Sequence, residues 1–297
     1  MNNAQKSYQA HIENWDDRLD EANQRLFHIK NKDCITYQLT KKTLDNLSPF
    51  TIDKSNWLTI GDYNGLEANY LLNNGQNAKA SDITDTFLKL ALEEDLINDL
   101  DAVNVEKVQF PENSFDYVMC KEAFHHFPKA FLGLYEMIRC AKKAAIIIEP
   151  IDILGKMPLL LFMKNLMDRF DPMLINKFWK NRFSFETVGN YVFKISERDI
   201  EKIAMGMGLP CIAFKRFNLL LNVNVESEIL NQTPLNRKYW DKIMSKTKLL
   251  NILSYLHILP YNHLVCVVFK SMPKENVINE MESHGYSILT LPENPYL

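Results

Sequence analysis

Glycine is scarce in this sequence, with only nine in 297 residues, so each glycine at a demanding backbone position is informative. The composition excludes a collagen-like chain, and five cysteines in a chain of this length exclude a disulfide-rich miniprotein. Apolar residues make up 46% and charged residues 24%, which predicts a sizeable core rather than a largely disordered chain. The length suits one large domain or a domain with insertions.

An excess of positive charge is also missing, since 34 basic residues face 37 acidic ones. Proteins that bind nucleic acid usually carry a basic excess or stripe, because phosphate contacts dominate their affinity, so no nucleic-acid partner is predicted. The cysteines form no CxxC pair and no cluster with histidine at metal-ligand spacing, so they are expected to be reduced thiols and no metal site is predicted. They are Cys34, Cys120, Cys140, Cys211 and Cys266.

Long hydrophobic runs are absent as well. The longest apolar runs, at 144–148 and 158–163, fall far short of the roughly 20 residues that cross a bilayer. Residues 1–17 lack the apolar core of a signal peptide. The sequence therefore predicts a cytoplasmic protein without a membrane span, and it does not indicate the oligomeric state.

Short apolar runs alternate with helical patterns from Trp57 onward, which is typical of βαβ units and a parallel sheet. The division that we expect is an N-terminal helical lid, a first α/β half, a helical insertion, the remainder of the α/β domain and a C-terminal tail. These are residues 1–50, 51–150, 151–195, 196–270 and 271–297.

Strands are predicted at 57–60, 78–82, 102–105, 115–119, 144–148, 209–217 and 263–270. They predict a Rossmann-like, doubly wound α/β fold with a mostly parallel seven-stranded sheet, in which the parallel arrangement resumes after the insertion. Ligands of such sheets bind beyond the carboxyl ends of the strands.

The first strand ends in Gly61-Asp62-Tyr63-Asn64-Gly65, directly before a predicted helix. Glycines at such a turn permit a tight bend and let a ligand approach the backbone and the helix amides. The spacing is GxxxG rather than the dinucleotide pattern GxGxxG. By itself, this pattern is equally compatible with a plain strand-to-helix turn.

The next two strands also end in residues that suit a nucleoside. Asp82, followed by Ile83, lies 21 residues after Gly61, and an acid at this separation can accept both hydroxyl hydrogens of a ribose. Asn104 can bond an adenine amine, and the neighbouring Val105 can offer its N–H to a ring nitrogen. One alternative is that Asp82 caps the next helix, and another is that Asp82 and Asp85 divide ribose binding and capping between them. The alternative for Asn104 is a turn residue.

Taken in this order, with FPENSFDYV at 110–118 and EAFHHF at 122–127, these residues resemble the class I S-adenosylmethionine-dependent methyltransferases, particularly the small-molecule type. The resemblance covers about residues 55–150. It implies a bound S-adenosylmethionine, with S-adenosylhomocysteine as product. It also implies that the glycine turn and the end of the fourth strand hold the methionine part, the acid holds the ribose, and the third strand end frames the adenine. The implied cofactor residues are Gly61, Asp62, Tyr63, Gly65, Asp82, Ile83, Asn104, Val105 and Lys121.

The sequence departs from the family pattern at two positions. Thr59 stands where the family usually has an acid, and Tyr63 replaces the middle glycine of the turn. Either Asp62 or Glu122 could supply the missing carboxylate. These departures keep a second hypothesis open, namely a catalytically silent binding or interaction module on the same scaffold. A nucleotide-sugar or NAD enzyme is disfavoured because GxGxxG is absent.

Candidate catalytic residues follow the fourth and fifth strands. His125 or His126 could remove a proton from an acceptor hydroxyl, and Glu149 could orient the ring. The alternative is that the two histidines are structural and Glu149 is a turn carboxylate. The favoured function is methyl transfer to a small-molecule acceptor, with oxygen slightly favoured over nitrogen.

The flanking segments could close over the acceptor. Aromatic and methionine side chains of the insertion could line its pocket, although at helical spacing they could equally form a core. These residues are Phe162, Met163, Met167, Phe170, Met173, Phe178, Trp179, Phe183 and Phe185. An N-terminal amphipathic helix that carries Tyr8 and Trp15 could form the other lid.

Overall fold

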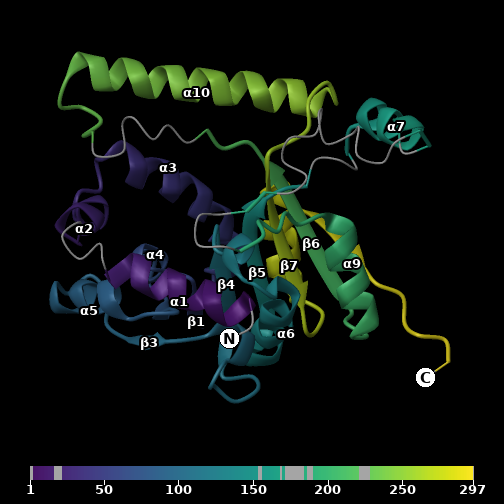
Figure 1. The fold of residues 1–297 in the computed structure, drawn as a ribbon, viewed down its shortest axis with the longest axis horizontal. Helices are drawn as coiled ribbons and strands as arrows, with labels where there is room; N and C mark the ends of the chain where they lie inside the picture. Colours follow the sequence, from purple (N-terminus) through teal and green to yellow (C-terminus); the bar gives the residue numbers. More distant parts are fainter. Residues whose placement is uncertain are drawn as a thin grey trace.

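The computed structural model describes residues 3–16, 22–152, 156–167, 169–170, 184–185, 190–220 and 228–296. The described residues form one eight-stranded sheet with the strand order β3-β2-β1-β4-β5-β7-β6-β8 (Figure 1). The strands are β1 (Asn56–Ile60), β2 (Asn77–Asp82), β3 (Leu100–Ala102), β4 (Phe115–Lys121), β5 (Ala141–Pro150), β6 (Cys211–Phe217), β7 (His263–Phe269) and β8 (Ser287–Thr290). The order reverses at β1, between β2 and β4. The predicted doubly wound α/β class is confirmed.

Helices cover both faces of the sheet. They are α1 (Asn3–Asp16), α2 (Ala22–Lys30), α3 (Ile35–Leu44), α4 (Leu66–Asn73), α5 (Thr86–Glu93), α6 (Ala130–Cys140), α7 (Pro158–Met167), α9 (Glu197–Gly206), α10 (Pro234–Tyr255) and α11 (Glu275–Ser283). Short 3-10 helices are η2 (Asp45–Phe50), η3 (Val105–Lys107) and η4 (Phe124–His126).

The alternation of side chains along the central strands creates the two cores. On β4, Tyr117 and Met119 join the core beneath α3, α4 and α11, while Val118 and Cys120 join the core beneath α6 and α9. This alternation follows from the two-residue period of a strand, and burial on both faces explains why these strands read as continuous apolar runs.

The expectation that the parallel arrangement resumes is wrong for β7. This strand runs antiparallel to both of its neighbours, with His263 paired with Pro150 of β5 and with Phe217 of β6. The start of β7 therefore lies at the edge where the parallel strands end. Residue alternation cannot distinguish the two directions, because a buried strand presents the same apolar pattern in either.

The expected C-terminal tail contains regular structure. Within residues 271–297, α11 packs beside the sheet and β8 pairs antiparallel with β6, which adds an eighth strand to the seven expected. Burial of Met281 and Tyr286 in the core stabilises this segment.

Of the predicted insertion, the structure describes α7, whereas Met173, Phe178, Trp179 and Phe183 lie outside the described residues. Within the part of the chain that the structure describes, no helix combines the length and apolar character needed to cross a membrane.

Candidate active site

The turn between β1 and α4 depends on its two glycines. Gly61 and Gly65 have φ angles of +71° and +79°, in the left-handed region that other residues rarely adopt. A Cβ on Gly61 would lie 2.3 Å from the Cβ of Ala123, and one on Gly65 would lie 2.9 Å from Cγ2 of Ile97. Both positions therefore need glycine for conformation and for space.

Asp62 holds this turn against the start of α4. Its carboxyl group accepts hydrogen bonds from the N–H groups of Glu67 (3.2 Å) and Ala68 (2.8 Å) and from the Thr59 hydroxyl (2.9 Å). Burial raises the pKa of Asp62 well above its usual range, and the neighbouring Glu67 carboxylate raises it further. Asp62 thus organises the turn, and its oxygens lie next to the position where the family pattern has its usual acid.

Tyr63 fits the turn without strain. The described non-glycine residues with positive φ are Asp95, Asn113, Glu122 and His257, so the backbone of Tyr63 needs no glycine. Its ring packs edge-to-face on Phe87 of α5, with centroids 6.2 Å apart. The replacement of the family glycine is therefore compatible with the turn.

Asp82 ends β2 with its carboxylate nearly buried. Its Oδ1 accepts the N–H of Ile83 at 2.7 Å. Burial raises the pKa of Asp82 to about 7, although backbone N–H groups of Ile83 and Thr84 oppose the shift. Helix α5 begins later, at Thr86, with Asp85 as its N-cap residue, so Asp82 is not the cap of that helix.

The third strand end forms a tight turn. Asn104 Oδ1 accepts the N–H of Glu106 at 2.9 Å, as an N-cap of the short helix η3, and Val105 is buried against α6. Asn104 therefore acts as a turn residue, as the alternative prediction has it. A second lone pair of its Oδ1 can accept from another donor.

A chain of ionic contacts runs along the carboxyl edge of the sheet. Lys121 Nζ lies 3.2 Å from Glu67 Oε1 and 3.3 Å from Glu122 Oε2, and Glu122 Oε1 lies 3.2 Å from His263 Nε2. Burial alone would raise the pKa of Glu122, but Lys121 and His263 lower it to about 2. Burial opposes ionisation of Glu67 too, yet Lys121 and Asp62 hold its pKa below the usual range. Both glutamates are therefore anionic at neutral pH.

Glu122 occupies a strained backbone position, with φ of +49°. Such a conformation costs on the order of 1–3 kcal/mol for a non-glycine residue and is concentrated at functional sites. Sequence reasoning missed Glu67 and His263. The position of Glu67 in the first helical turn after Gly65 could have indicated its place in the site. His263 could not have been found, because a parallel β7 would have its first residue at the opposite edge of the sheet.

His125 and Glu149 form a close pair at the ends of β4 and β5. His125 Nδ1 lies 2.6 Å from Glu149 Oε2, and the other carboxylate oxygen accepts the N–H of Phe124 at 2.7 Å. Glu149 is fully buried, and this burial raises its pKa although His125 acts in the opposite direction. Because both oxygens of Glu149 are engaged, the carboxylate fixes the orientation of the His125 ring.

His126 lies beside His125, with ring centroids 4.1 Å apart, and both imidazoles are half-buried. Helix α1 reaches this pair through His11, whose ring lies edge-on to His126 at 5.7 Å. Asn190 contacts both α1 and the histidine pair. Its Nδ2 donates to the His125 carbonyl, and its Oδ1 lies 3.3 Å from His11 Nε2.

These residues fit S-adenosylmethionine. The carboxylate of Asp82 can accept from two hydroxyls, and anionic Glu67 and Glu122 can accept from an ammonium group. Among the described residues, no group of three or more His, Cys, Asp or Glu side chains could hold a metal ion.

A comparison with protein families bears on the domain that carries these residues. Residues 58–148 match the family model described as "Methyltransferase domain". The match and the strand order confirm the predicted methyltransferase domain on a doubly wound α/β fold over these residues. Among curated protein sequences, none matches the chain.

The chain is similar to solved structures at low identity. A methyltransferase of Haloferax volcanii, in complex with the activator Trm112, is 11% identical with a TM-score of 0.51, over 88% of this chain and 98% of that chain. A methyltransferase of Archaeoglobus fulgidus is 13% identical with a TM-score of 0.49, over 78% and 94% of the two chains. A phosphoethanolamine N-methyltransferase of Haemonchus contortus is 17% identical with a TM-score of 0.48, over 78% and 53%.

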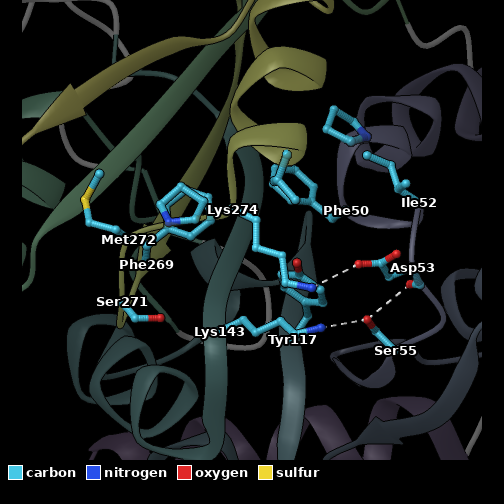
Figure 2. Close-up of a pocket in the computed structure, with 13 residues that line it drawn as sticks. Phe50, Ile52, Asp53, Ser55, Tyr117, Lys143, Phe269, Ser271, Met272 and Lys274 are labelled. Atoms are coloured by element: carbon cyan, nitrogen blue, oxygen red, sulfur yellow. Dashed lines mark hydrogen bonds and ion pairs between the residues drawn. The ribbon is translucent and has the colours of Figure 1, made fainter.

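A separate cavity of about 150 Å³ lies at the opposite edge of the sheet (Figure 2). Lys143 Nζ donates to Ser55 Oγ at 3.0 Å there, and Lys274 Nζ lies 3.4 Å from Asp53 Oδ2. Because these residues flank the amino ends of β1 and β5, the cavity is not part of the candidate active site.

The tight fit at Gly61 predicts a large loss of stability on substitution. Gly61→Ala should lower the free energy of unfolding by roughly 2–5 kcal/mol, through the left-handed backbone and the collision with Ala123. Urea denaturation measures the loss. Gly75→Ala is the matched control, because its φ is +76° but nothing lies within 4 Å of its Cβ. Equal losses in the two variants would contradict the proposed close packing.

Proposed function

We propose that this protein transfers the methyl group of S-adenosylmethionine to a hydroxyl oxygen of a small-molecule acceptor, with His125 as general base. The observation that carries the proposal is the 2.6 Å contact between His125 and the fully buried Glu149. A ring held in this way presents its other nitrogen, Nε2, in one direction, so it can accept a proton when the oxygen attacks.

The cofactor residues take separate roles. Asp82 would accept the ribose hydroxyls, Asn104 and Val105 would border the adenine, and Glu67 and Glu122 would accept from the ammonium of the methionine part. When bound, S-adenosylmethionine supplies an activated methyl group on a sulfonium. This chain then aligns the acceptor and takes up its proton at His125, which Glu149 stabilises when charged.

Two flanking segments would exclude water from this reaction. Helix α1 contacts the histidine pair through His11, and the insertion reaches it through Asn190, which supports the lid roles proposed for residues 1–50 and 151–195. An amine acceptor that arrives neutral needs no base. The contribution of His125 to turnover therefore distinguishes an oxygen acceptor from a nitrogen acceptor.

Addition of S-adenosylhomocysteine should raise the thermal transition of the protein, because a ligand that binds only the native state stabilises it by mass action. At 100 times the Kd the gain is about 2.7 kcal/mol. Differential scanning calorimetry with a ligand series measures the shift, with adenosine alone as a weaker-binding control. No shift at millimolar ligand would favour the silent-module hypothesis over the enzyme.

A further inference from the structure

Helix α10 concentrates positive charge on a chain that is acidic overall. Its 22 residues contain five basic side chains and one acidic one, whereas the whole chain has a net charge of −3. The basic residues are Arg237, Lys238, Lys242, Lys246 and Lys248. All five are exposed, and the acidic Asp241 pairs with Arg237 at 3.3 Å. The charge is therefore available on the surface.

The last turns of α10 and the residues after it are apolar and exposed. The helix buries a narrow stripe that includes Asn236, Trp240, Ile243 and Ser254. Exposed apolar side chains then follow at Leu249, Ile252, Tyr255, Leu256, Ile258 and Leu259. Tyr255 is 76% exposed, so its ring projects from the protein rather than lying on it.

Helix α7 and the turn after it expose apolar side chains in the same way. Leu159, Phe162, Leu166 and Phe170 are all exposed, with Leu159 at 73% and Phe170 at 80%. Single exposed apolar residues are ordinary, but groups of large ones mark an interaction site.

The exposed apolar groups of α7 and of the end of α10 are both close in sequence to one pair of neighbouring residues in the sheet. Helix α7 begins eight residues after Pro150, and α10 ends eight residues before His263, the strand partner of Pro150. The adjoining chain segments are joined by a hydrogen bond of 3.1 Å from the N–H of Ile151 to the carbonyl of Asn262. Figure 1 shows α7 and the end of α10 on the same side of the molecule.

We infer that these two groups, here called the docking face, bind the surface of a bilayer that contains anionic lipids. The face comprises Leu159, Phe162, Leu166, Phe170, Leu249, Ile252, Tyr255, Leu256, Ile258 and Leu259. Projecting apolar side chains beside lysines are the pattern of segments that lie in the membrane interface. The lysines add attraction to anionic headgroups, and their long stems reach past the apolar residues. Highly exposed, projecting side chains suit insertion among lipids better than a protein surface that must match their shape.

The location also bears on the acceptor. The chain segments that carry the docking face adjoin Pro150 and His263, at the same edge of the sheet as Glu149, so a bilayer bound there would lie on the side of the sheet that carries the candidate active site. A lipophilic acceptor could then enter from the membrane. This last step rests on the proposed function, whereas membrane binding itself does not.

Vesicle flotation tests the inference without any activity assay. The full chain should float with phosphatidylcholine vesicles that contain 30 mol% phosphatidylserine, about tenfold or more better than with phosphatidylcholine alone. Replacing Lys242 and Lys246 with Gln should weaken binding to the anionic vesicles by roughly 25-fold, about fivefold for each lysine. Leu256→Ser with Ile258→Ser should weaken binding to both kinds of vesicle.

Helix α5 supplies the matched controls, Lys89→Gln and Leu92→Ser, which are exposed but lie outside the docking face. They should leave flotation unchanged, and circular dichroism should show that every variant is folded. Absence of flotation by the wild type, or equal losses in the α5 variants, would overturn the inference. Light scattering measures the oligomeric state and so tests the main alternative, that the docking face is a dimer interface. A dimer that Leu256→Ser with Ile258→Ser converts to monomer, without any vesicle binding, would make the docking face an interface between two copies.

Discussion

Replacing His125 with alanine is expected to lower turnover by about 10²–10⁴-fold while the affinity for S-adenosylhomocysteine remains nearly unchanged. The ring contacts Glu149 and its neighbour His126, and His125 is not among the residues assigned to the cofactor, so its loss should affect proton removal more than binding. The measurement is methyl transfer from radiolabelled S-adenosylmethionine to the best acceptor in a panel of hydroxylated and amine-bearing small molecules. Titration calorimetry gives the affinity in parallel.

Three variants sharpen this test. Glu149→Gln should reduce turnover in the same direction but less, because the amide can still accept the N–H of Phe124 while the charge that supports a protonated His125 is lost. His126→Ala should have the smaller effect of the two histidine replacements, and His284→Ala, directly after α11, should have none. A folded His125→Ala enzyme with full turnover on a hydroxyl acceptor would refute the base. Full turnover confined to amine acceptors would instead assign nitrogen methylation.

Replacing Asp82 with alanine should weaken S-adenosylhomocysteine binding by about 2–3 kcal/mol, roughly a 30- to 150-fold rise in Kd, as expected for hydrogen bonds to a charged group. Titration calorimetry at pH 8 measures the change. The neighbouring Asp85→Ala is the control, since that carboxylate pairs with Lys89 at the surface. A folded Asp82→Ala protein with unchanged affinity would refute the ribose assignment.

The pKa of Asp82, about 7, adds a pH dependence to this binding. The ionised carboxylate can accept from both ribose hydroxyls, whereas the protonated form has less capacity to accept and carries no charge. Affinity should therefore be constant above pH 8 and fall below pH 7, by up to about tenfold for each pH unit. In Asp82→Ala this dependence should disappear. If the affinity of the wild-type protein did not change between pH 5.5 and 8, this role of the ionised Asp82 carboxylate would be contradicted.

The two departures from the family pattern are accommodated together. Thr59 donates its hydroxyl to Asp62, so a carboxyl group still lies beside the first glycine, and the Tyr63 ring packs on α5. The glycines that remain, Gly61 and Gly65, are the two positions of this turn whose φ angles are positive. The turn thus keeps glycine where the backbone requires it, which is an argument against a degenerate domain.

The sequence was sufficient to predict the α/β class, the glycine turn and the strand ends that carry Asp82, Asn104 and His125. Apolar runs with helical patterns between them determine a buried sheet, and residues at the carboxyl ends of its parallel strands must share one edge. Local information is enough for these features, because each depends on a short segment and its period.

Only the tertiary structure decided which charged groups meet. The Lys121 ammonium lies between the carboxylates of Glu67, from α4, and Glu122, directly after β4. His263 joins them because β7 is antiparallel, a direction that an apolar run does not reveal. The 2.6 Å contact between His125 and Glu149 depends equally on the pairing of β4 with β5. Contacts between residues far apart in the chain, and the pKa values that follow from their burial, arise from packing and have no signature in a single sequence.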